Sequence, residues 1–254
     1  EVFENFPQWK ADGFAQLAEE GAGFLSIAAS NPELLKNVNP KKIAASNKSS
    51  SQAMKKFREY TMNDHVAWCV ISLPTKDWAN KVFPDVTDKE AIDNLWSAIF
   101  KAVRIDSEDP VEAWNDHIKN ITEKVNFLNE KKFKTLHYTT SNGTDLTIEL
   151  PEGHIWAGGG ELNTKGIYFV ANMPTEEVFT MPKKTGVNGV VVSTKPLNYS
   201  GNLIDRFKLT FKDGKVVDFE AEKGYETLKN LLDTDEGTKY LGEVALVPFD
   251  SPIS

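Results

Sequence analysis

The sequence predicts an α/β protein in which alternating helices and strands, to about residue 132, are followed by a mostly β (α+β) part. Apolar residues recur at helical spacing through most of the first half, and the period changes to alternation near Phe133. In the second half, Asn-Gly and Asp-Gly dipeptides, which favour two-residue hairpin turns, lie between strand-like runs. We therefore expect two domains, residues 1–132 and residues 133–254.

The first part predicts helices at residues 7–21, 46–63, 88–103 and 109–132, and strands at residues 24–29 and 66–73. The strand at 24–29 is expected to be buried, because nearly all of its residues are apolar. Asn31 and Pro32 predict the start of another helix, with Asn31 as its cap and Pro32 at the first helical position.

The second part predicts a hairpin of strands 135–140 and 144–150 around Ser141-Asn142-Gly143. Further strands are expected at residues 166–171, 187–194, 205–212, 216–222 and 242–247, with a short helix at 225–232. Asp213-Gly214 is the favoured two-residue turn between two of these strands. Gly158-Gly159-Gly160 predicts a tight turn with close backbone approach, since no helix follows it as in a phosphate loop.

Composition excludes several classes of function. A net charge of -8 and a pI near 5.2 argue against a nucleic-acid-binding protein, which needs a basic face. The sequence has neither a signal peptide nor an apolar run long enough to cross a membrane. A single cysteine, Cys69, cannot form an internal disulfide and fits a reducing compartment. We therefore expect a cytoplasmic protein without nucleic-acid or membrane partners.

Glu176 and Glu177 stand between Pro174 and Pro182, in a segment flanked by strand-like runs. Proline fixes φ and removes a backbone donor, so both edges of the segment have restricted geometry. Neighbouring side chains of an extended segment point to opposite faces. One of the two glutamates must therefore face inward, where a carboxylate is costly unless a cation or hydrogen bonds compensate it. The pair thus predicts a cation site.

Glu243 is a second candidate, because it directly precedes the apolar run of residues 244–247 and so lies at the start of a predicted buried strand. A capping or rim carboxylate is the alternative interpretation. A two-metal hydrolytic site needs hard oxygen ligands, usually with histidine added. The four histidines show no metal-ligand spacing, and we expect them to be structural or surface residues: His65, His117, His137 and His154.

Three segments carry a family resemblance: Trp-Ala-Gly-Gly-Gly at 156–160, Asn-Met-Pro-Thr-Glu-Glu-Val-Phe-Thr-Met-Pro at 172–182, and Tyr-Leu-Gly-Glu-Val-Ala-Leu-Val-Pro-Phe-Asp at 240–250. Together they resemble the M29 family of thermophilic-type metalloaminopeptidases, most of all its PepS and AmpS branch. The similarity runs over essentially the whole chain, including the helix around Trp9 and residues 31–35.

The resemblance implies a metal-dependent aminopeptidase with two divalent cations (zinc, cobalt, manganese or magnesium), held by two Glu, two His and one Asp with a Tyr nearby. Matched by motif, the two glutamates are Glu177 and Glu243. The resemblance places the other positions beyond Ser254, and family chains begin some tens of residues before Glu1. It thus implies an internal fragment, expected to be inactive alone. Glu176 is expected to bind the substrate amine or to support the ligands.

The resemblance also implies short peptides as substrates and a homodimer. Two other functions stay open on the residues alone. Without the missing ligands, the chain would be a non-catalytic binding or dimerisation module. Alternatively, Glu177 and Glu243 would be the acid and base of a glycoside hydrolase, whose activity would need no metal.

Overall fold

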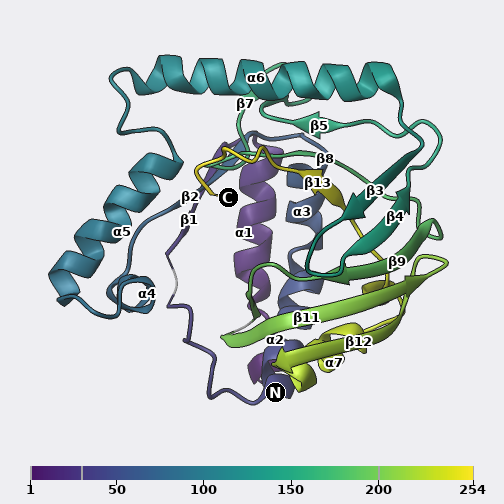
Figure 1. The fold of residues 1–254 in the computed structure, drawn as a ribbon. Coiled ribbons are helices and arrows are strands. Elements are labelled where there is room, and N and C mark those ends of the chain that lie inside the picture. Colours follow the sequence, from purple (N-terminus) through teal and green to yellow (C-terminus); the bar gives the residue numbers. More distant parts are fainter. Residues whose placement is uncertain (1, 30, 200, 254) are drawn as a thin grey trace. The chain divides into compact units, whose positions relative to one another are not determined.

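The computed structural model describes residues 2–29, 31–199 and 201–253 and contains helices together with several sheets, so the α/β class is confirmed (Figure 1). These residues form two compact units. The first comprises residues 2–118, 159–175 and Ile253, and the second comprises residues 119–158 and 176–252. The division into domains at residue 132 stays a prediction.

The first unit contains most of the helices. Its elements are η1 (Val2–Glu4), α1 (Gln8–Glu19), β1 (Phe24–Ala28), α2 (Pro40–Ala53), α3 (Lys55–Met62), β2 (Trp68–Ser72), α4 (Lys76–Val82), α5 (Asp88–Ala102), β6 (Glu161–Leu162) and β7 (Tyr168–Phe169). The helix α6 (Pro110–Lys131) begins in this unit and continues into the second. Of these elements, the sequence did not predict η1, α4 and β6. The single helix expected at residues 46–63 is divided into α2 and α3.

An aromatic cluster holds α1, α3 and β1 together. The rings of Phe14, Phe24 and Phe57 lie 4.9–6.4 Å apart between centroids, at tilted or edge-on angles. Figure 1 shows α1 and α3 side by side. Strand β1 pairs in parallel with β2, and Val70 of β2 also hydrogen-bonds to the backbone of Ala171 and Met173. The loop at 171–173 is thus fixed to the first unit.

The predicted strand at 24–29 forms as β1, but the expectation that it is buried is wrong. Leu25 is 63% exposed and Ile27 is 54% exposed. Among the described strands, β1 pairs only with β2, so one of its edges has no partner strand. An apolar run predicts a strand, whereas its burial depends on segments far away along the chain.

The helix expected at Asn31-Pro32 is also wrong, because residues 32–37 form turns. The side chain of Asn31 does accept a hydrogen bond of 2.8 Å from the backbone of Glu33, as a cap would. The helix α2 begins instead at the second Asn-Pro pair, where Asn39 accepts from the backbone of Lys41. A local cap signal is therefore not sufficient to start a helix.

The second unit is mostly β. Its elements are β3 (Thr135–Thr139), β4 (Asp145–Glu149), β5 (Ala157–Gly158), β8 (Val178–Thr180), β9 (Val187–Val192), β10 (Leu197–Tyr199), β11 (Asn202–Lys212), β12 (Lys215–Lys223), α7 (Tyr225–Leu232), η2 (Gly237–Lys239) and β13 (Val244–Leu246). The two predicted hairpins are confirmed as β3–β4 and β11–β12. Asp213 and Gly214 both have positive φ, as the turn between β11 and β12 requires.

One antiparallel sheet forms the main layer of this unit, in the order β10-β11-β9-β4-β3 with β12 added beside β11. Its inward residues pack with α7 and the second half of α6 into one core, which includes Ile121, Ile148, Ile204, Phe211 and Leu228. A smaller antiparallel sheet has the order β13-β8-β5. Val178 of β8 and Val244 of β13 also belong to this core, so it supports the small sheet.

Candidate metal centre

The small sheet carries both predicted metal ligands. Glu177 immediately precedes β8, and Glu243 immediately precedes β13. The two strands are antiparallel, with Val178 opposite Leu246 and Val244 opposite Thr180. The carboxylates therefore stand at the two ends of a ladder that is only three residue pairs long.

Burial alternates along residues 176–182, as expected for an extended segment. Glu176, Val178 and Thr180 are buried, whereas Glu177 and Phe179 are partly exposed. Glu176 is thus the glutamate that faces inward. By the same alternation, Glu177 lies on the outer face, and the strand register assigns Glu243 to that face as well.

The charge of Glu243 acts on the outward carboxylate of Glu177. The pKa of Glu177 is raised, first because burial removes water from its carboxylate and second because of the negative charge of Glu243. Glu243 is the more exposed of the two, so water screens its charge more strongly. Folding therefore brings together two acidic side chains that are 66 positions apart in the printed sequence, counting from Glu177 to Glu243.

Exposed apolar side chains share this face. Met181, which follows β8, is 64% exposed, and Val247, which follows β13, is 44% exposed. The alternation places both on the same side as the two carboxylates. The outer face thus combines negative charge with apolar surface.

The backbone of β5 lies directly against Glu177. A Cβ atom on Gly158 would come within 2.5 Å of the Glu177 carbonyl oxygen and within 3.2 Å of the Val178 Cα. Only glycine permits this approach, which confirms the close backbone contact expected for the glycine run. Two residues further along β8, the Thr180 hydroxyl donates a 2.8 Å hydrogen bond to the Ile155 carbonyl.

The inward glutamate has a hydrogen-bond partner that the sequence did not indicate. The Ser251 hydroxyl donates to Oε2 of Glu176 over 2.8 Å, and the two residues are only 9% and 4% exposed. Ser251 lies in a turn closed by a hydrogen bond from its backbone N–H to the Pro248 carbonyl. No local signal could have revealed a partner 75 residues away in the sequence.

Each of the four histidine rings forms a hydrogen bond, and two of these bonds join residues that are far apart in the sequence. Their ring nitrogens contact the Thr164 hydroxyl (His65), the Thr175 carbonyl (His117), the Asp145 carboxylate (His137) and the Pro151 carbonyl (His154). Within residues 2–29, 31–199 and 201–253, no group of three or more His, Cys, Asp or Glu could hold a metal ion. Glu177 and Glu243 fit the hard, anionic oxygen donors of a divalent-cation site, but as an incomplete set.

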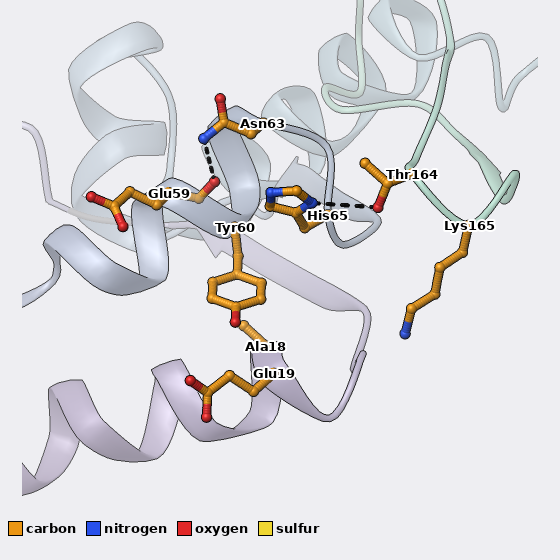
Figure 2. Close-up of a pocket in the computed structure, with 8 residues that line it drawn as sticks. All are labelled: Ala18, Glu19, Glu59, Tyr60, Asn63, His65, Thr164 and Lys165. Carbon is orange, nitrogen blue, oxygen red and sulfur yellow. Dashed lines mark hydrogen bonds between the residues drawn. The ribbon is translucent and has the colours of Figure 1, made fainter.

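The first unit contains a cavity of ≈ 470 Å³. Figure 2 shows its lining, which consists of Ala18, Glu19, Glu59, Tyr60, Asn63, His65, Thr164 and Lys165. Lys165 extends from its loop toward the end of α1 (Figure 2), while Glu19 is already paired with Lys56. The cavity is lined by none of the candidate metal ligands.

Asp64, in the turn after α3, and Glu161, in β6, form a pair of carboxyl groups in the same unit. The pKa of Glu161 is raised by burial and then by the charge of Asp64 and a hydrogen bond with it. Below the ordinary Glu pKa, Glu161 is protonated in the folded and unfolded chains alike. As the pH rises through the interval between the ordinary and the raised pKa, the unfolded chain loses this proton first, so the wild type loses stability.

Glu161→Gln is therefore expected to stabilise the chain at about pH 7, by only a few tenths of a kcal/mol because the site is in contact with water. The gain should disappear at about pH 4. Urea unfolding at about pH 7 and at about pH 4 measures the free energy of unfolding of the variant and of the wild type. The exposed Glu152→Gln variant is the control. A variant that is less stable than the wild type at neutral pH, or an equal gain at both pH values, would contradict the raised pKa.

No helix in the described part of the chain is long and apolar enough to cross a membrane.

Comparisons with known proteins agree with the motifs. The sequence model of the thermophilic metalloprotease (M29) family matches residues 1–254. Aminopeptidase AmpS of Bacillus subtilis (strain 168) is 54% identical over 254 residues, which are 100% of this chain and 62% of the relative. Aminopeptidase 2 of Geobacillus stearothermophilus is 55% identical over 254 residues, which are 100% of this chain and 61% of the relative.

A solved structure of wild-type AmpT from Thermus thermophilus superposes with a TM-score of 0.92 at 39% identity. The superposition covers 99% of this chain and 62% of that chain. The chain thus spans about three-fifths of the length of the relatives that it matches. Since the family model covers every residue, the chain belongs to the thermophilic metalloprotease (M29) family.

Proposed function

We propose that residues 1–254 are the part of a metal-dependent aminopeptidase that supplies Glu177 and Glu243 to a site for two divalent cations. The cations would be zinc, cobalt, manganese or magnesium. The substrates are short peptides with a free N-terminal amine, and the enzyme acts as a homodimer in the cytoplasm. The ligand set of residues 1–254 alone is partial, so this chain by itself is inactive.

The observation that carries this proposal is the electrostatic interaction of Glu177 with Glu243 on one face of the small sheet. Two carboxylates that repel each other are stabilised when a cation binds between them. The family membership and the aminopeptidase names of the relatives support the same function.

When bound at such a site, divalent cations polarise a scissile carbonyl and lower the pKa of a water molecule. In this chain, Glu177 and Glu243 would hold the cations with their carboxylate oxygens. Their negative charge also attracts the positively charged N-terminus of a peptide. The exposed side chains of Met181 and Val247 offer apolar surface to the side chain of the N-terminal residue.

A binding or dimerisation module without chemistry is the second candidate. It is favoured by the incomplete ligand set among the described residues. The two functions differ in what happens when the carboxylates are replaced: a module has no peptidase activity to lose.

The proposal is tested in the full-length enzyme, by which we mean a protein of the relatives' full length that carries residues 1–254. Release of the N-terminal residue from a tripeptide is expected to stop after dialysis against EDTA, because the carboxylates alone cannot polarise the carbonyl. Adding back Zn²⁺, Co²⁺ or Mn²⁺ should restore it. An N-acetylated tripeptide, which lacks the cationic amine, serves as the control and should not be cleaved. Activity that persists in EDTA would contradict the proposal.

A further inference from the structure

Glu176 and Ser251 form a buried polar contact beside the candidate ligand Glu177. Both side chains are at least nine-tenths buried, and the Ser251 hydroxyl donates to the carboxylate over 2.8 Å. A buried carboxylate is costly without donors, and a hydrogen bond to a charged group is among the stronger ones. The contact therefore fixes both groups in place.

This hydrogen bond lies where the strand ladder does not reach. The pairing of β8 with β13 and β5 starts at Val178, so residues 175–177 have no ladder partner among the described strands. The inward side chains of β8 are held by the core at Val178 and by the Ile155 carbonyl at Thr180. Glu176 adds a third inward anchor, directly before the outward Glu177.

Ser251 also connects the two ligand-bearing strands. It follows β13, which Glu243 opens, and its turn returns the chain to the start of β8, where Glu177 stands. Because neighbouring residues of an extended segment point to opposite faces, fixing Glu176 inward fixes Glu177 outward. The Glu176–Ser251 contact thus determines the direction of the Glu177 side chain from the opposite face of the strand.

We propose that Glu176 and Ser251 are positioning residues, which hold the Glu177 carboxylate toward Glu243 for cation binding. This inference rests on the proposed function. Glu176 then acts through Glu177 and does not contact the substrate. Of the two roles expected for Glu176 from the resemblance, support of the ligands is the one assigned here.

The test uses Mn²⁺ as the probe and the full-length enzyme, freed of its metal by dialysis against EDTA, as the protein. Paramagnetic broadening of backbone amide signals reports which residues lie close to the bound cation. The wild-type enzyme is expected to lose the signals around residues 177 and 243 first. Ser251→Ala should raise the Mn²⁺ concentration for half-maximal broadening about tenfold, because partners of metal ligands commonly have effects of this size.

Three further variants separate positioning from general stability. Ser251→Thr keeps the hydroxyl and should restore binding. Glu176→Gln keeps an oxygen that accepts from Ser251 and should stay within about twofold of the wild type. Ser193→Ala is the matched control, because the Ser193 hydroxyl oxygen accepts a 3.0 Å hydrogen bond from the Phe207 backbone in the same unit. It should lower the melting temperature without changing the Mn²⁺ response.

The outcomes distinguish this inference from the proposed function. If Glu177→Gln and Glu243→Gln remove the local broadening while Ser251→Ala leaves it unchanged, the metal site stands and the positioning role is overturned. The positioning role is also overturned if Ser193→Ala weakens the response as much as Ser251→Ala. If the full-length wild-type enzyme shows no local broadening, the proposed metal site fails and the inference fails with it.

Discussion

Replacing Glu177 by glutamine is expected to abolish metal-dependent release of N-terminal residues by the full-length enzyme. Glutamine keeps the size of the side chain but removes the negative charge that would hold a cation opposite Glu243. Cation stabilisation of the transition state is worth several kcal/mol, and about 1.4 kcal/mol corresponds to a tenfold change in rate. We therefore expect kcat/KM for a tripeptide to fall on the order of 10³-fold or more.

The matched control is Glu152→Gln, an exposed carboxylate of the same unit. It should retain wild-type kcat/KM, and both variants should keep the circular dichroism spectrum of the parent. A Glu177→Gln enzyme with full activity would refute the assignment of Glu177. The same substitution also addresses the glycoside hydrolase hypothesis, under which peptide release would be unaffected.

The largest expected loss of stability follows from truncating Trp156. This side chain is 1% exposed and lies in the core of the second unit. Its backbone is held by two hydrogen bonds with the side chain of Asn129, at 2.8 and 2.9 Å. Trp156→Ala leaves a cavity that the fixed backbone cannot close, and we expect the free energy of unfolding to fall by about 3–5 kcal/mol.

Trp156→Phe is the matched variant. Among the described residues, the Trp156 indole N–H has no hydrogen-bond partner, so phenylalanine removes no bond and retains most of the apolar ring. It should lose less than half of what the alanine variant loses. Urea unfolding followed by circular dichroism measures both. Equal losses in the two variants would show that packing of the ring does not determine the effect.

Local signals predicted individual elements well. The helix Tyr225–Leu232 has the expected bounds, and Asp213-Gly214 forms the expected turn. The same signals failed where the outcome depended on distant segments. Asn31-Pro32 and Asn39-Pro40 are the same dipeptide, yet only the second pair starts a helix, α2. Capping stabilises a helix end but cannot by itself supply the packing that keeps a helix folded.

By itself, the sequence determined that one glutamate of the pair at 176–177 faces inward, because alternation in an extended segment is a local property of the backbone. The motifs around Glu177 and Glu243 also determined the family. Only the tertiary structure decided that Glu176 is the inward residue and that Ser251 donates to it. It alone placed the charges of Glu177 and Glu243 within reach of each other. The physical reason is that these contacts depend on the register of β8 against β13, which is set by the core beneath both strands.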